Sequence, residues 1–184
     1  MVSSIATVMT TGVKGQIEAI SQSEAKKLAI PDSSVVTIHR ITCPDVELLA
    51  ELAKFQERIF SGHRHNRLAE LLEAVSLQDS QVVYLARRHG QICGFVFLKR
   101  RSRKGEWVVR GIGVDRSYRR RGVGSALLTR AIAMVKRIKG DGLVSYVDVN
   151  NRASLRLHER MGFAFRQDPT LPAPRLRFRM VFSQ

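Results

Sequence analysis

Cysteine is almost absent from this chain of 184 residues, in which only Cys43 and Cys93 occur. Two cysteines give no disulfide framework, and neither belongs to a CxxC pair of the kind that holds zinc. The chain is long enough to bury a stable core without such links. We therefore expect one main domain and no metal site.

Long apolar runs are also missing. The apolar run at residues 92–98 is too short to span a bilayer. Residues 1–13 carry no charge, so they lack the basic start of a signal peptide, and the first arginine, Arg40, comes too late for a transit peptide. The sequence thus predicts a cytoplasmic protein that does not enter a membrane.

A glycine-bearing loop at residues 119–124 follows a strand-like segment and opens a helix-like one. Such a loop exposes backbone N–H groups that, with the helix dipole, bind phosphate oxygens. Glycine suits Gly122 and Gly124 because a β-carbon would hinder the approach of phosphate. Arg119, Arg120 and Arg121 add charge-assisted donors. A solvated turn before a surface helix is the simpler alternative.

Two common phosphate loops do not fit, because Gly124 is followed by Ser125-Ala126 rather than Lys-Ser/Thr, and position 127 is a leucine. The pattern Arg119-x-x-Gly122-x-Gly124 instead resembles the acyl-CoA pyrophosphate loop of the GCN5-related N-acetyltransferase (GNAT) superfamily. This resemblance implies acetyl-CoA as co-substrate. The cofactor-binding residues that it implies are Ile112, Gly113, Val114, Arg119, Arg120, Arg121, Gly122, Val123, Gly124, Ser125, Asn151 and Ser154.

A second block strengthens the resemblance: Asn151-x-x-Ser154-x-x-Leu157-His158-x-x-x-Gly162-Phe163. It is similar to the superfamily helix beside the pantetheine arm and the thiol. Asn151 is a good N-cap, and Gly162 suits the C-terminal turn. The distance between the two blocks accommodates one helix and one strand, and the resemblance covers roughly residues 36–182.

His158 occupies the position where the family commonly has a tyrosine that protonates the departing CoA thiolate. Histidine also donates a proton, although its reference pKa is about 6.5 against about 10 for tyrosine. Two hypotheses remain equal: His158 is the acid, or it is a helix-surface residue and the acid is water or another group. The candidate general bases are Glu106 and Asp148. Asp148 has the alternative of pairing with Arg110, and water is the alternative to both carboxylates.

The pattern of elements predicts a mixed α/β fold in residues 35–184, preceded by an extension over residues 1–34 with a short helix. Alternating and helical periodicity predict strands at 35–40, 81–88, 92–100, 106–114, 144–149 and 175–180, a further strand that begins at Phe163, and helices at 45–60, 64–75, 125–139 and after Asn151. This order favours a mixed sheet with helices on both faces. The resemblance implies a mostly antiparallel sheet whose two central parallel strands splay apart. Gly111 and Gly113 in one of these strands indicate either close approach of a ligand or a β-bulge.

The net charge of +15 lies entirely in residues 99–184, which hold 21 Lys/Arg and six Asp/Glu, whereas residues 1–98 hold ten of each. Part of it suits a polyanion such as CoA. The basic cluster at 99–104 is separated from the glycine loop by a strand of roughly 20 Å. We favour a solvated turn there over a contact with RNA, the ribosome or an acidic protein.

The resemblance implies transfer of an acetyl group from acetyl-CoA to a primary amine, by direct attack in a ternary complex. The acceptor would be held between residues 61–66 and 167–174. Its identity, a small molecule or a protein, is open, as is a homodimer. The alternatives are an acyl-CoA- or RNA-binding module with little turnover, and an acetyltransferase for a nucleic-acid-linked or ribosomal substrate.

Overall fold

The computed structural model describes residues 36–42, 45–59, 80–101, 105–166 and 175–182. The expected extension at 1–34, the predicted helix at 64–75 and the two expected acceptor segments, 61–66 and 167–174, lie outside these residues.

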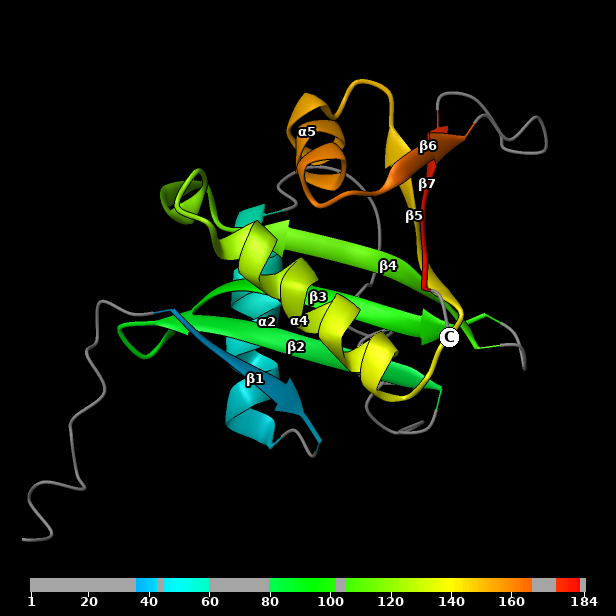
Figure 1. Cartoon of the computed structure of the whole chain (residues 1–184). Helices are drawn as coiled ribbons and strands as arrows, with labels where there is room; N and C mark the ends of the chain where they lie inside the picture. The colour runs from blue at the N-terminus through cyan, green and yellow to red at the C-terminus, as the bar shows by residue number, and fades with distance from the viewer. Residues whose placement is uncertain (1–35, 43–44, 60–79, 102–104, 167–174, 183–184) are drawn as a thin grey trace, which may run out of the picture. The chain divides into compact units, whose positions relative to one another are not determined.

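Within the described residues, seven strands form one mixed sheet in the order β1-β2-β3-β4-β5-β7-β6 (Figure 1). Every neighbouring pair is antiparallel except β4 and β5, which run parallel. The expected mixed, mostly antiparallel sheet is therefore confirmed. The strands are β1 (Thr37–Ile41), β2 (Gln81–Arg88), β3 (Gln91–Arg100), β4 (Glu106–Val114), β5 (Gly142–Asp148), β6 (Ala164–Arg166) and β7 (Arg175–Val181).

Helices cover both faces of this sheet. Helix α2 (Val46–Ile59) lies behind β2 and β3 in Figure 1, and α4 (Val123–Arg137) crosses in front of them. Helix α5 (Arg152–Arg160) follows β5. Among the described residues, no helix is long and apolar enough to cross a membrane.

The alternation of side chains along β2 explains the two layers. Val82, Tyr84 and Ala86 point into a core shared with α4, and Val83 and Leu85 point into a core shared with α2. Since successive residues of a strand face opposite sides, a strand that is apolar at every position is buried on both. Partly buried residues of α5, among them Leu155, pack against the core of α4.

Most element boundaries lie within two residues of the predicted ones. Helix α4 begins at Val123 rather than Ser125, because Gly122, with φ of 81°, already serves as its N-cap. The positive φ is an unfavourable conformation for any residue with a β-carbon. The glycine loop is thus directly continuous with the helix.

Candidate functional site

The site begins where the two parallel strands separate. Strands β4 and β5 pair only from Glu106↔Gly142 to Val109↔Ser145, although β4 continues to Val114 and β5 to Asp148. On its other side, β4 has a β-bulge, because Phe97 pairs with Gly111 and Leu98 with Val109, which leaves Arg110 unpaired. The bulge accounts for one of the two strand glycines, and the gap leaves backbone groups of β4 unpaired towards β5.

A short, tightly hydrogen-bonded connection joins the open end of β4 to the glycine loop. Asp115 caps a single 3₁₀ turn at Arg116–Tyr118 by accepting hydrogen bonds from the Ser117 amide at 3.0 Å and hydroxyl at 2.7 Å. These hydrogen bonds, with Arg58 on α2, lower the pKa of Asp115, so the carboxylate stays charged. The connection fixes the direction in which the loop leaves the strand.

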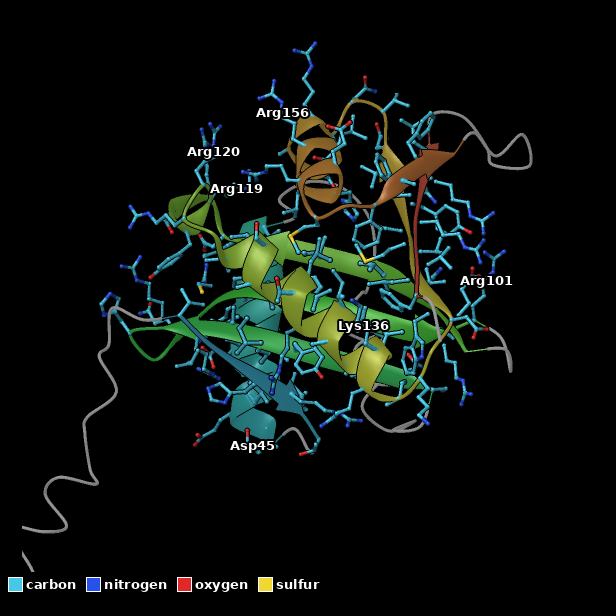
Figure 2. All side chains as sticks on the ribbon, viewed as in Figure 1. Asp45, Arg101, Arg119, Arg120, Lys136 and Arg156 are labelled. Atoms are coloured by element: carbon cyan, nitrogen blue, oxygen red, sulfur yellow. The ribbon has the colours of Figure 1, made fainter. Side chains whose placement is uncertain are left out.

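The loop at 119–124, hereafter the phosphate loop, presents donors at the N-terminus of α4. The first helical amide with a carbonyl partner is that of Ala126, which donates to Gly122 O at 2.9 Å. By helix geometry the N–H groups of Val123, Gly124 and Ser125 have no such partner within the helix. Arg119 Nε donates to Val114 O at 3.1 Å, while Arg120 has a φ of 64° and an exposed side chain (Figure 2).

A cavity of about 640 Å³ connects this helix terminus with the gap between the strands. All of the predicted cofactor-binding residues line it except Arg121. Five residues that were not predicted to bind the cofactor complete the wall, and one of them, Leu157, belongs to the second sequence block: Ile59, Tyr118, Ala153, Leu157 and Arg160. Helical spacing could have predicted Leu157, because a residue three positions after Ser154 lies on the same face of a helix.

Glycine occupies the positions around the cavity for different structural reasons. At Gly122 a β-carbon would meet nothing within 4 Å, so the positive φ is the constraint and a side chain would project into open space. At Gly124 a β-carbon would lie 3.2 Å from Leu157 Cδ2, and at Gly113 it would lie 2.7 Å from Phe95 Cε1. At Gly124, contact with Leu157 is therefore a second reason for glycine, in addition to the expected close approach of phosphate.

Helix α5 forms the side of the cavity opposite the glycine loop. Asn151 caps it, as predicted, by accepting a hydrogen bond from Ser154 N at 3.1 Å. The cap presents Asn151, Ser154 and Leu157 to the cavity. The turn between β5 and α5 and the cap of α5 thus hold the second sequence block against the first one without any covalent link.

His158 turns away from the cavity and into the core. It is fully buried and contacts Phe163 and Phe178, whose ring centroids lie 5.1 and 5.4 Å away. Its Nδ1–H donates to Ser154 O at 2.8 Å, and Nε2 has no partner among the described residues. Burial lowers the pKa of His158 below its usual range, so the neutral form dominates near pH 7. The alternative of a helix-surface residue is therefore wrong.

The two carboxylates proposed as bases lie at different ends of the parallel pair. Glu106 is at the paired end and faces Arg101, Arg177 and Arg179 at 3.6, 3.8 and 3.4 Å. Asp148 is exposed at the open end of β5, where Oδ1 accepts the Asn150 amide at 2.8 Å. Neither lines the cavity, and among the described ion pairs Asp148 has none with Arg110.

A model of the acetyltransferase (GNAT) family matches residues 47–163, which is more than half of the chain. This chain belongs to the GNAT family. The match contains both sequence blocks, the splayed strands and the cavity between them. The glycine loop, the gap between the strands and the capped helix α5, which all border the cavity, thus lie within the part of the chain that matches the family.

Known proteins that resemble this GNAT chain include a mycothiol acetyltransferase of Corynebacterium aurimucosum, 28% identical over 65% of this chain and 44% of that protein. The chain thus spans less than half the length of that relative. The crystal structure of the ribosomal-protein-S18-alanine N-acetyltransferase from Escherichia coli has a TM-score of 0.66 at 18% identity, covering 82% of this chain and 96% of that one. This likeness shows the fold.

A third resemblance involves a bound ligand. The structure of a streptothricin acetyltransferase from Bacillus anthracis in complex with acetyl coenzyme A has a TM-score of 0.51 at 26% identity, and the match covers 57% of this chain and 64% of that one.

Proposed function

We propose that this protein is an acetyl-CoA-dependent N-acetyltransferase that transfers the acetyl group directly to a primary amine in a ternary complex. The observation that carries the proposal is the cavity of about 640 Å³, which runs from the free N–H groups of α4 to the gap between β4 and β5. A long anionic molecule with amide groups along its middle suits that combination of donors.

The residues along the cavity divide the recognition of acetyl-CoA into two parts. The N–H groups of Val123, Gly124 and Ser125, with Arg119 and Arg120, would bind the phosphates. The backbone of Ile112, Gly113 and Val114, which pairs with β3 but not with β5, would pair on its open side with the amides of the pantetheine arm, as an added strand does. The acyl end would then lie furthest from the phosphates, near the point where the strands rejoin.

The reaction needs a neutral amine beside the thioester. The amine nitrogen attacks the carbonyl carbon, the C–S bond breaks, and the nitrogen loses a proton while the CoA thiolate gains one. Holding both substrates in one cavity makes this step effectively unimolecular, which accounts for most of the expected acceleration. The products are the N-acetylated amine and CoA.

For the proton transfers, we favour Asp148 acting through water as the base. It lies beside the open part of the gap, whereas Glu106 lies at the paired end among three arginines. His158 would need a proton on Nε2 to act as the acid, but burial opposes the imidazolium form. Solvent in the cavity is then the better candidate for protonating the thiolate.

The proposal specifies the acceptor only as a primary amine. The mycothiol acetyltransferase relatives support acetyl transfer, and the excess of basic residues supports an anionic or ribosomal partner, in the cytoplasm. A binding module with little turnover is the second candidate, since none of the proposed acid–base residues lines the cavity. A homodimer is compatible with either function.

The test is binding first and turnover second. Acetyl-CoA should raise the melting temperature of the full chain in a concentration-dependent way. No shift at millimolar acetyl-CoA would contradict the proposal. Thiol release with a panel of primary amines then separates the two candidates, because a binding module would show the shift without release. Asp148→Asn should lower kcat and leave the acetyl-CoA shift intact.

A further inference from the structure

Helix α5 carries a row of three arginines that the proposed function leaves unused. Arg152, Arg156 and Arg160 follow one another at intervals of four residues, and all three are exposed. None of them forms an ion pair among the described residues, and neither does Glu159, the one carboxylate of the helix. The guanidinium groups of this row are therefore available to an anion from outside the chain.

The row is inclined to the helix axis, so its three members lie at different distances from the cavity. Arg160 lines the cavity beside Ala153 and Leu157 of the same helix. Four residues turn an α-helix by one full revolution and about 40° more. Arg156, which does not line the cavity, therefore lies about 40° around the helix from Arg160, at the rim. Arg152 lies about 80° away, on the outer side of the helix.

The cavity thus has cationic side chains on two opposite walls. Arg119 and Arg120 come from the phosphate loop, and Arg160 comes from α5. In Figure 2, Arg120 and Arg156 extend outwards at the same end of the molecule, one from the loop and the other from the helix. A polyanion that enters between the loop and α5 meets guanidinium groups on both sides.

The two walls suit different phosphate groups. The loop offers backbone N–H groups at the N-terminus of α4, whereas Arg160 is the last residue of α5, where the helix offers no free N–H group and its dipole is negative. An anion beside Arg160 is therefore held by side chains alone. Two guanidinium groups suit a phosphate monoester, which carries nearly two negative charges at neutral pH and has three acceptor oxygens.

CoA carries such a monoester on its ribose, in addition to the pyrophosphate. We infer that Arg160 and Arg156 bind this 3′-phosphate, apart from the pyrophosphate site of the loop, and so make the protein select CoA over 3′-dephospho-CoA. The inference rests on the proposed function, because it requires acetyl-CoA in the cavity. Arg160 makes the contact from within the cavity, Arg156 adds to it from the rim, and Arg152 takes no part.

The experiment compares two ligands that differ only in this phosphate. Acetyl-CoA and acetyl-3′-dephospho-CoA are titrated into the full chain by calorimetry under identical conditions. We expect the parent to bind acetyl-CoA about thirtyfold more tightly, as hydrogen bonds between charged groups would give. The ratio of the two affinities isolates the monoester, because every other group of the ligand is the same.

Variants of the row assign this ratio to individual arginines. Arg160→Gln should bring the ratio close to one by weakening acetyl-CoA, while the affinity for the dephospho form stays that of the parent. Arg160→Lys should keep part of the ratio, because it keeps the charge without the planar fork. Arg156→Gln should lower it about threefold, as the loss of one exposed ion pair would. Arg152→Gln is the matched control and should leave it unchanged.

Two results would overturn the inference while acetyl-CoA still binds. One is equal affinity of the two ligands for the parent, or a ratio that survives in Arg160→Gln. The other is an equal loss in Arg152→Gln and Arg160→Gln, which would indicate a diffuse effect of the charge of α5 instead of a site. If the parent binds neither ligand, the proposed function itself fails and the inference fails with it.

Discussion

The phosphate loop and a second region of the molecule are both rich in arginine, yet they are built in opposite ways. We call the second region the arginine face: Arg101, Glu106, Tyr146, Arg177 and Arg179. Arg119, Arg120 and Arg121 are exposed and, among the described residues, form no ion pair. Their loop supplies backbone N–H groups at a helix terminus. The arginine face has no such backbone donors; its guanidinium groups are held by Glu106 and Tyr146.

This difference indicates which region would bind a ligand and which would hold the sheet. Backbone donors need close approach, so the loop depends on glycine and tolerates little change. The guanidinium groups of the arginine face are already held by a carboxylate, and their ion pairs link β4 to β7 across β5. We therefore expect the loop, together with Arg160 of α5, to determine affinity for acetyl-CoA and the arginine face to stabilise the sheet.

The largest effect should come from Gly122→Leu. The new side chain would enter the cavity, and the positive φ of 81° would strain the loop, so acetyl-CoA affinity should fall roughly a hundredfold, as for two lost charge-assisted hydrogen bonds. The matched control is Gly90→Leu, with φ of 76° and equally open space in the β2–β3 hairpin. Both variants should lose similar thermal stability. If both also lost acetyl-CoA binding, the effect would be global rather than local.

A smaller effect is expected from Arg120→Gln, which should weaken acetyl-CoA binding about tenfold at low salt. Because the guanidinium is exposed, the difference between parent and variant should shrink at 1 M salt. Titrations at two salt concentrations, with Arg137→Gln as control, measure this. An unchanged affinity at low salt would remove Arg120 from the phosphate site.

Of the two regions, only the phosphate loop could be predicted from the sequence. Arg119-x-x-Gly122-x-Gly124 is contiguous, and the strand and helix around it have clear periodicity. Glu106 and Arg177 are 71 positions apart in the numbering, and their meeting depends on β7 inserting between β5 and β6, which no local pattern encodes. Of the two hypotheses for His158, the helix-surface residue is wrong, and its spacing of three from Leu155, which packs against the core, was the available sign that it lies on the inner side of α5.

Glu106→Gln tests whether the arginine face stabilises the sheet. Removing the shared carboxylate leaves three guanidinium groups without it, so the free energy of unfolding should fall by about 1–2 kcal/mol at low salt and by less at 1 M salt. Denaturant unfolding of parent and variant gives the value, and acetyl-CoA affinity should not change. An unchanged free energy of unfolding at low salt would contradict a stabilising role for the arginine face.

His158→Phe should have the smallest effect on binding, although His158 lies between the two regions, against Ser154 of the cavity wall and Phe178 of β7. Because burial lowers the pKa of His158 in the folded state, the stability that it contributes is present above about pH 6.5. That stability is lost as the pH falls below this value towards the lowered pKa. Melting curves between pH 5 and 8 should show this loss in the parent and much less of it in the variant. Turnover near pH 7 that falls steeply in His158→Phe would instead restore His158 as the acid.

The separation of the two arginine regions is tested most directly by one set of calorimetric titrations. Acetyl-CoA is titrated into the parent, Arg120→Gln, Arg177→Gln and the double variant under identical conditions. We predict that Arg120→Gln weakens binding about tenfold, that Arg177→Gln leaves it unchanged, and that the double variant equals Arg120→Gln, since the two sites share no contacts. A loss in Arg177→Gln as large as that in Arg120→Gln would contradict the account, because the arginine face would then bind acetyl-CoA itself.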